Sequence, residues 1–98
     1  MTALKLRILF DGAMIGPGKA QLLDEIRDTG SIAAAGRRMQ MSYKRAWSLV
    51  EEMNAAFADP RVASVRGGPG GGGAVLTDTG AEVLRLYSLA LERAEAAA

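Results

Sequence analysis

The sequence contains no cysteine and no histidine. Without cysteine there is no disulfide and no thiolate nucleophile, and without either residue the chain lacks the usual ligands of a zinc site. The imidazole group that most often acts as a general acid or base is missing as well. We therefore expect no catalytic residues and no cofactor, and an enzyme is the least favoured class of function.

Aromatic residues are also few, with one Trp, two Tyr and two Phe among 98 residues. A chain of this length is expected to form one domain, here residues 1–98. Hydrophobic residues make up 49% of the composition, so a core built mainly from aliphatic side chains is possible. A domain this small buries only about two-thirds of its unfolded surface, so its stability margin is narrow without a partner.

Long hydrophobic runs are absent, and no apolar segment approaches the length that spans a membrane. Lys5 and Arg7 interrupt the apolar N-terminal segment, which therefore lacks the continuous apolar core of a signal peptide. We expect a cytoplasmic protein with no membrane partner.

The net charge of +1 conceals an uneven distribution. Residues 29–50 contain no acid and carry the basic side chains Arg37, Arg38, Lys44 and Arg45. Residues 60–77 also contain no acid and carry Arg61 and Arg66. Charged runs are usually solvated surfaces, but a basic patch on a nearly neutral domain is also typical of nucleic-acid binding.

Hydrophobic periodicity predicts a mostly helical chain with a small β part. Residues 4–10 alternate as a half-buried strand, and a loop is expected over 11–18. Three helices should follow, over 19–28, over 32–39 and from a cap at Ser42 to about Phe57. Gly30 and Ser31 have the residue types expected of a C-terminal and an N-terminal cap.

The remaining residues predict a β-hairpin and a long helix. Strands over 62–66 and 74–77 flank a glycine-rich segment, and Thr77 is expected to cap a helix over 78–96. The order of strand, three helices, hairpin wing and long helix is that of a winged helix-turn-helix domain.

The second and third predicted helices form the helix-turn-helix. The small residues 33–36 allow the third helix to cross closely, with Ala46, Leu49, Val50, Met53 and Phe57 as its inner stripe. Its first turns are polar and cationic, as contacts to phosphates and base edges require. The candidate DNA-contacting residues on this helix are Ser42, Tyr43, Lys44, Arg45 and Ser48.

Alternative interpretations apply to several of these side chains. A cation at a helix N-terminus lowers helix stability by roughly 0.3–1 kcal/mol through its interaction with the helix dipole. Lys44 and Arg45 therefore indicate a requirement other than helix stability. Trp47 is better explained as a hydrophobic filler than as a wedge into DNA, whereas Tyr43 fits either role. Arg37 and Arg38 lie where a helix crossing the DNA backbone meets phosphates, but a solvated surface explains them equally well.

The glycine run formally contains the dinucleotide-binding pattern G-x-G-x-x-G over residues 68–73. That motif must lead from a strand into a helix, and here it leads into a strand, so nucleotide binding is disfavoured. As a hairpin tip, the run would lay the backbone N–H groups of residues such as Gly68 and Gly70 along a phosphate backbone. Arg66 stands at the base of this predicted wing.

The last predicted helix is apolar on more than one stripe over residues 83–91. Such a helix needs burial on two sides, and a small monomer offers only one. The pattern therefore predicts a homodimer with Leu84, Tyr87 and Leu91 in its interface.

Four segments together resemble one known family: residues 42–47 (SYKRAW), 52–54 (EMN), 70–77 (GGGGAVLT) and 30–32 (GSI). They resemble the N-terminal DNA-binding domain of the molybdate-responsive transcription regulators called ModE, and the resemblance extends over nearly the whole chain. It implies a winged helix-turn-helix, a homodimer formed largely through the first and last helices, and operator binding that often represses molybdate uptake genes.

Regulators of that family usually continue into oxyanion-binding domains, whereas this sequence ends at Ala98. We therefore expect no C-terminal oxyanion-binding domain and no small-molecule effector bound by this chain. The expected partner is double-stranded DNA carrying an inverted-repeat operator. The alternative is a dimerising module that modulates a longer homologous regulator without binding DNA, and the basic first turn of the third helix argues against it.

Overall fold

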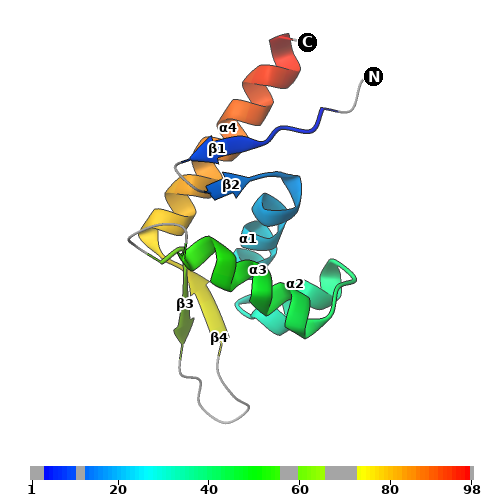
Figure 1. Ribbon diagram of the computed structural model, residues 1–98, viewed down its shortest axis with the longest axis vertical. Helices are drawn as coiled ribbons and strands as arrows, with labels where there is room; N and C mark the ends of the chain where they lie inside the picture. Colours follow the sequence, from blue (N-terminus) through cyan, green and yellow to red (C-terminus); the bar gives the residue numbers. More distant parts are fainter. Residues whose placement is uncertain (1–3, 11–12, 56–59, 66–72, 98) are drawn as a thin grey trace.

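The computed structural model describes residues 4–10, 13–55, 60–65 and 73–97. Figure 1 shows its elements, which are β1 (Ile8–Phe10), β2 (Ala13–Ile15), α1 (Pro17–Thr29), α2 (Ile32–Arg38), α3 (Tyr43–Ala55), β3 (Val62–Val65), β4 (Gly73–Leu76) and α4 (Asp78–Ala97). A helix-turn-helix followed by a β-hairpin and a long helix confirms the predicted winged helix-turn-helix class.

The N-terminal segment differs from the prediction, because the expected loop over 11–18 contains a strand. Strand β2 pairs antiparallel with β1, with Ile15 opposite Ile8, and helix α1 begins at Pro17. The glycines on both sides of this short strand are typical of a loop, so the sequence did not predict it. In the structure, Ile15 is only 1% exposed. Only residues 8–10 of the predicted first strand are assigned to a strand, and these are the residues that pair with β2.

The predicted caps are confirmed by their hydrogen bonds. Ser31 Oγ accepts from the N–H of Ala34 at 3.1 Å, and Ser42 Oγ accepts from the N–H of Arg45 at 3.0 Å. Gly30 ends α1 in the left-handed conformation, with φ of 70°. Each cap satisfies a backbone group that the helix itself leaves without a partner.

The turn between α2 and α3 brings the two helices into close contact. A Cβ atom at Gly36 would lie 3.1 Å from Cβ of Ala46, so the small residue permits this crossing as predicted. The N–H of Met41 donates to the carbonyl of Gly36 at 2.9 Å. Gln40, in the same turn, has a φ of 58°, which is the left-handed region.

The core lies where α1, α2, α3 and α4 meet the two strand pairs. Its least exposed large side chains are Ile15, Leu22, Leu23, Ile26, Val50 and Met53. The predicted inner stripe of α3 is buried at Ala46, Leu49, Val50 and Met53, while Phe57 lies outside the described residues. The helix-turn-helix is therefore fixed from behind by aliphatic packing.

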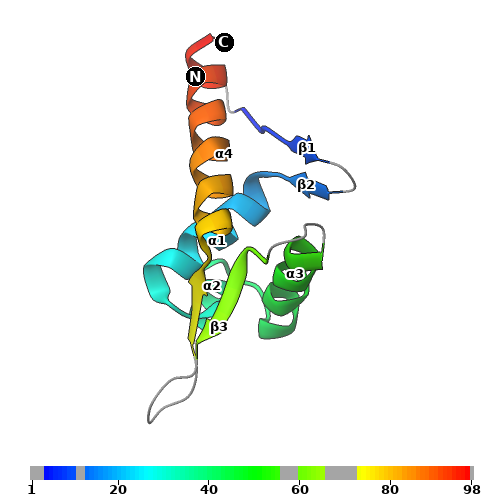
Figure 2. The ribbon, with the colours of Figure 1, turned by 90° about the vertical axis from the view of Figure 1, so that its left-hand side faces the viewer.

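The strands of the wing form a two-stranded antiparallel sheet in which Val62 faces Leu76 and Val65 faces Gly73. This sheet is held to the end of α1, because the N–H of Ala74 donates to the carbonyl of Gly30 at 2.8 Å. A Cβ atom at Gly73 would lie 2.7 Å from the same carbonyl oxygen, so the contact requires glycine. The wing and the far end of α4 point to opposite ends of the molecule (Figure 2).

Helix α4 is joined to the rest of the chain at its N-terminal end and through Tyr87. Thr77 Oγ1 accepts from the N–H of Gly80 at 3.0 Å, which confirms Thr77 as its N-cap. The Tyr87 hydroxyl donates to the carbonyl of Leu6 at 2.7 Å, and burial raises the pKa of this hydroxyl. Within the described residues, none of the helices has the length and apolar character required to span a membrane.

Candidate nucleic-acid interface

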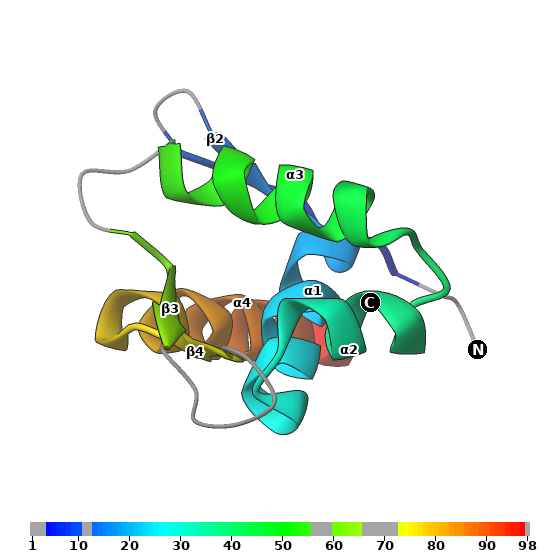
Figure 3. The same cartoon turned by 90° about the horizontal axis from the view of Figure 1, so that it is seen from below.

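Helix α3 presents its first turns at the surface of the molecule. The side chains of Ser42, Tyr43, Lys44, Arg45 and Ser48 are all exposed, whereas Ala46 and Leu49 of the same helix are buried. Figure 3 shows α3 lying across one side of the molecule, with α4 and the strands of the wing on the other side. The structure therefore brings the predicted α3 residues together on one exposed surface, which we call the α3 surface.

The cations of the α3 surface are available to an anionic partner. Within the described part of the chain, Lys44, Arg45 and Arg37 take part in no ion pair. By contrast, Glu52 in the second half of α3 pairs with Lys19 of α1 at 3.0 Å. The basic end of α3 is thus free, while an acid of its other end is neutralised from α1.

The two arginines predicted on α2 differ in their surroundings. Arg38 Nε lies 2.9 Å from Oε2 of Glu25, so this arginine ties α2 to α1. Arg37 is exposed in the last turn of α2. Of the pair, Arg37 is the better placed to meet a phosphate, because its charge is not shared with a carboxylate.

A third basic group that sequence reasoning missed is Arg7. Arg7, Lys19 and Arg45 line one hollow of about 320 Å³, whose other walls are apolar side chains and the first turn of α1. The signal was present in the alternation of residues 4–10, which places Lys5 and Arg7 on the outer face of the strand. Only the fold shows that Arg7 extends the cationic area beside Arg45.

Tyr43 and Trp47 lie one helical turn apart and contact each other. The indole Nε1–H of Trp47 donates to the Tyr43 hydroxyl oxygen. The two rings are edge to face, with centroids 6.4 Å apart. Trp47 is partly buried and packs against the core, as its interpretation as a filler predicted, whereas Tyr43 is 56% exposed.

Asn54 is a second residue whose role the sequence did not reveal. Its Oδ1 accepts from the N–H groups of Arg61 and Val62 at 2.7 and 3.1 Å, and its Nδ2 donates to the carbonyl of Val62 at 3.1 Å. These bonds join the end of α3 to the start of β3. Asn54 therefore fixes the wing relative to the helix that carries the α3 surface.

The predicted wing contacts Arg66, Gly68 and Gly70 lie outside the described residues. The strands that lead to them are described, and Val75 of β4 is 47% exposed. The base of the wing is fixed by Asn54 on one strand and by Gly30 on the other.

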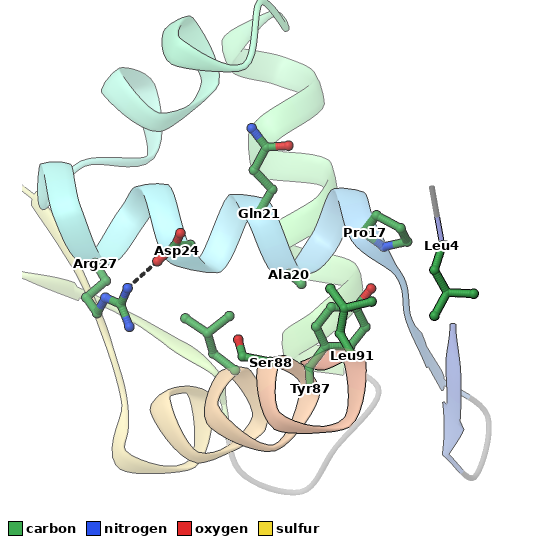
Figure 4. A pocket seen from close by; sticks show the side chains of 10 residues that line it. Leu4, Pro17, Ala20, Gln21, Asp24, Arg27, Tyr87, Ser88 and Leu91 are labelled. Carbon is green, nitrogen blue, oxygen red and sulfur yellow. Dashed lines mark hydrogen bonds and ion pairs between the residues drawn. The ribbon is translucent and has the colours of Figure 1, made fainter. Parts of the chain in front are cut away.

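The predicted dimer residues Leu84, Tyr87 and Leu91 all line one groove of about 380 Å³ between α1 and α4. Figure 4 shows Tyr87, Ser88 and Leu91 of α4 facing α1, where Asp24 and Arg27 form an ion pair. Leu84 and Tyr87 are 5% and 4% exposed, so most of their surface is already buried within the chain. Leu91 and Ser88 retain more surface that a second copy could cover.

The described residues contain no group of three or more carboxylates or other ligating side chains that could hold a metal ion. Among the described residues, exposed cations that take part in no ion pair gather on the α3 surface and at the hollow beside it. Cationic side chains on a helix backed by a rigid core are suited to binding a polyanion.

Comparison with known proteins gives one consistent group of relatives, although no family model matches the chain. Over 76 residues it is 46% identical to the molybdenum-pterin-binding protein MopB of Rhodobacter capsulatus, covering 78% of this chain and 28% of MopB. It is 39% identical over 95 residues to the transcriptional regulator ModE of Haemophilus influenzae, covering 96% of this chain and 37% of that protein. It is 41% identical over 73 residues to the DNA-binding transcriptional dual regulator ModE of Escherichia coli, covering 74% of this chain and 28% of that protein.

The chain thus spans roughly a third of the length of these curated relatives, between 28% and 37%. The match with the Haemophilus protein includes nearly all of the described helices and strands, because it covers 96% of the chain. The chain belongs to the ModE family and corresponds to the N-terminal domain of its members.

Proposed function

We propose that this chain binds double-stranded DNA in a sequence-specific manner and regulates transcription. The observation that carries the proposal is the α3 surface, where Lys44 and Arg45 are exposed and take part in no ion pair with the described residues. The names of two relatives, a transcriptional regulator and a DNA-binding transcriptional dual regulator, support the same function.

The roles of the side chains follow from their places on α3. Lys44 and Ser48 lie one turn apart and face outward, so they are the candidates for contacts to base edges in the major groove. Ser42 at the N-cap and Arg45 beside the hollow are better placed for phosphates. Arg7, across the hollow, would meet the same strand of the backbone.

Two further groups contribute backbone contacts in this proposal. Arg37 lies at the end of α2, where it would meet a phosphate beside the major groove. Arg66 and the glycines of the wing, Gly68 and Gly70, would contact the backbone or the minor groove. Because phosphate contacts release counterions, binding should weaken steeply as salt increases.

We further propose that the chain acts as a homodimer through the groove between α1 and α4. A twofold axis would set two α3 helices about 34–36 Å apart, which is one turn of DNA. The operator should then be an inverted repeat. Leu91 and Ser88 would supply the accessible side of the interface, backed by Leu84 and Tyr87.

Selection of bound sequences from a pool of random duplexes tests the proposal. The expected result is enrichment of an inverted repeat whose half-sites are separated by one helical turn or a multiple of it. A chain that is folded and dimeric but binds no duplex above a scrambled control at low salt would contradict DNA binding. That outcome would favour the alternative, a module that dimerises with a longer homologous regulator.

A further inference from the structure

The side chains of Tyr43 and Trp47, at the exposed end of α3, differ in how far the core packs around them. Trp47 is partly buried, and its ring packs against the core. Tyr43 is 56% exposed, and nothing in the core surrounds its ring. The core therefore fixes Trp47, and the bond from the Trp47 indole N–H to the Tyr43 hydroxyl oxygen fixes Tyr43.

The chemistry of this bond determines what the Tyr43 hydroxyl can do next. An indole N–H only donates, whereas a phenol carries one proton to donate and lone pairs that accept. Because Trp47 donates to the Tyr43 oxygen, the hydroxyl proton points away from Trp47. Among the described residues, no other side chain or carbonyl forms a hydrogen bond with this hydroxyl.

We propose that Trp47 is a positioning residue, which presents the Tyr43 hydroxyl as a hydrogen-bond donor to an acceptor atom of bound DNA. The inference rests on the proposed DNA binding and adds a determinant of specificity to it. The edge-to-face contact of the rings, with centroids 6.4 Å apart, supports the same orientation.

A fixed donor distinguishes among base edges in the major groove. Guanine offers N7 and O6, adenine offers N7 and thymine offers O4 as acceptors, whereas cytosine offers an amino donor. A phosphate oxygen is an acceptor of the same kind. The partner of Tyr43 is therefore an acceptor atom of DNA, on a base edge or on the backbone.

The first test needs no DNA, because Trp47 is the only tryptophan of the chain. Its indole N–H gives one cross-peak in a proton–nitrogen correlation spectrum. Tyr43→Phe should move this peak and speed the exchange of the indole proton with solvent. An indole peak that stays in place in the Tyr43→Phe variant would overturn the proposed bond.

The second test is a double-mutant cycle on the selected operator. Tyr43→Phe and Trp47→Phe should each weaken binding by about 3- to 10-fold, the usual effect of losing one hydrogen bond. The double variant should bind about as weakly as Tyr43→Phe alone, because Trp47 acts through Tyr43. Losses that multiply in the double variant would overturn the inference and leave DNA binding intact.

The dependence of binding affinity on DNA sequence shows whether the acceptor lies on a base edge or on a phosphate. If Tyr43 meets a base, Tyr43→Phe relaxes selectivity at one base pair, and if it meets a phosphate, all sequences weaken alike. Trp47→Phe must reproduce the same pattern for the inference to hold, and its melting temperature shows whether the variant is folded. If Trp47→Phe is unfolded, the indole peak and the Tyr43→Phe selectivity profile test the inference instead.

A wild-type chain that binds no duplex would overturn the proposed function, while the indole result would still report on the bond between Trp47 and Tyr43.

Discussion

At the scale of single residues, the turn between α2 and α3 contains an unfavourable backbone conformation. Gln40 has a φ of 58°, a region in which a side chain crowds the backbone and glycine does not. Gln40→Gly should therefore stabilise the domain by about 0.5–1 kcal/mol, a net gain after the greater flexibility of glycine in the unfolded chain. Thermal unfolding checks this, and an unchanged or lower melting temperature would contradict it.

Two glycines in helices give opposite expectations for the same substitution. A Cβ atom at Gly80 would lie 2.1 Å from the carbonyl oxygen of Arg61, whereas a Cβ atom at Gly18 would meet nothing within 4 Å. Gly80→Ala should cost about 1–3 kcal/mol through overpacking. Gly18→Ala, the matched control, should gain up to about 1 kcal/mol from helix propensity.

Denaturant unfolding of the two variants measures both values. Equal effects of the two alanines would show that helix propensity, and not the contact with Arg61, determines stability at Gly80.

Residue types explain which of these features the sequence could predict. Ser31, Ser42, Thr77 and Gly30 have side chains, or the lack of one, that fit caps, and the structure confirms all of them. Glutamine has no such preference, so nothing in the sequence marks Gln40 as left-handed. Likewise, Gly80 is close in space to Arg61 only because the strand and the helix fold together.

At the scale of elements, the coupling of α3 to the wing depends on Asn54. Asn54→Ala would leave the N–H groups of Arg61 and Val62 without their side-chain acceptor. A loss of about 1–3 kcal/mol is expected, because buried donors without partners are costly. Asn54→Asp keeps the acceptor oxygen and loses the N–H donated to Val62 O, so its loss should be smaller.

Chemical denaturation gives the ranking of these two variants, and the structure predicts wild type above Asn54→Asp above Asn54→Ala. The opposite order of the two variants would mean that a carboxylate oxygen against the carbonyl of Val62 costs more than the accepted pair of hydrogen bonds contributes, and would contradict the role given to that pair.

Long periodic elements are predictable from this sequence, and short ones depend on their partners. The helices are recognised from apolar stripes that repeat over several turns. Strand β2 has only the residues Ala13–Ile15, and it forms because β1 lies beside it. The hollow between Arg7 and Arg45 joins residues distant in the sequence, so no local pattern could reveal it.

At the scale of the whole molecule, the proposed dimer should depend on one face of α4. Leu91 lines the groove against α1, whereas Leu86 is 48% exposed and does not line it. Leu91→Glu should give a monomer that binds DNA weakly, because a buried charge without a partner is costly. Leu86→Glu is the matched control and should remain a dimer.

Sedimentation at tens of micromolar, roughly the range in which a micromolar dimer is populated, decides between the two faces. Wild-type monomer would contradict the dimer. If Leu86→Glu gave a monomer and Leu91→Glu stayed dimeric, the dimer would form through the outer face of α4.

If the first turn of α3 binds duplex DNA, the affinity must depend on the side chains of that turn and not only on the total charge of the domain, and one titration separates the two. The affinity of the selected operator is measured for the wild type, for Lys44→Ala and for Arg93→Ala, a control with the same loss of charge on the far part of α4. Lys44→Ala should weaken binding by about 1–3 kcal/mol and relax selectivity at one base pair, if Lys44 contacts a base as proposed. Arg93→Ala should bind nearly as the wild type does. Equal losses in the two variants would show that only overall charge matters, and would contradict recognition by α3.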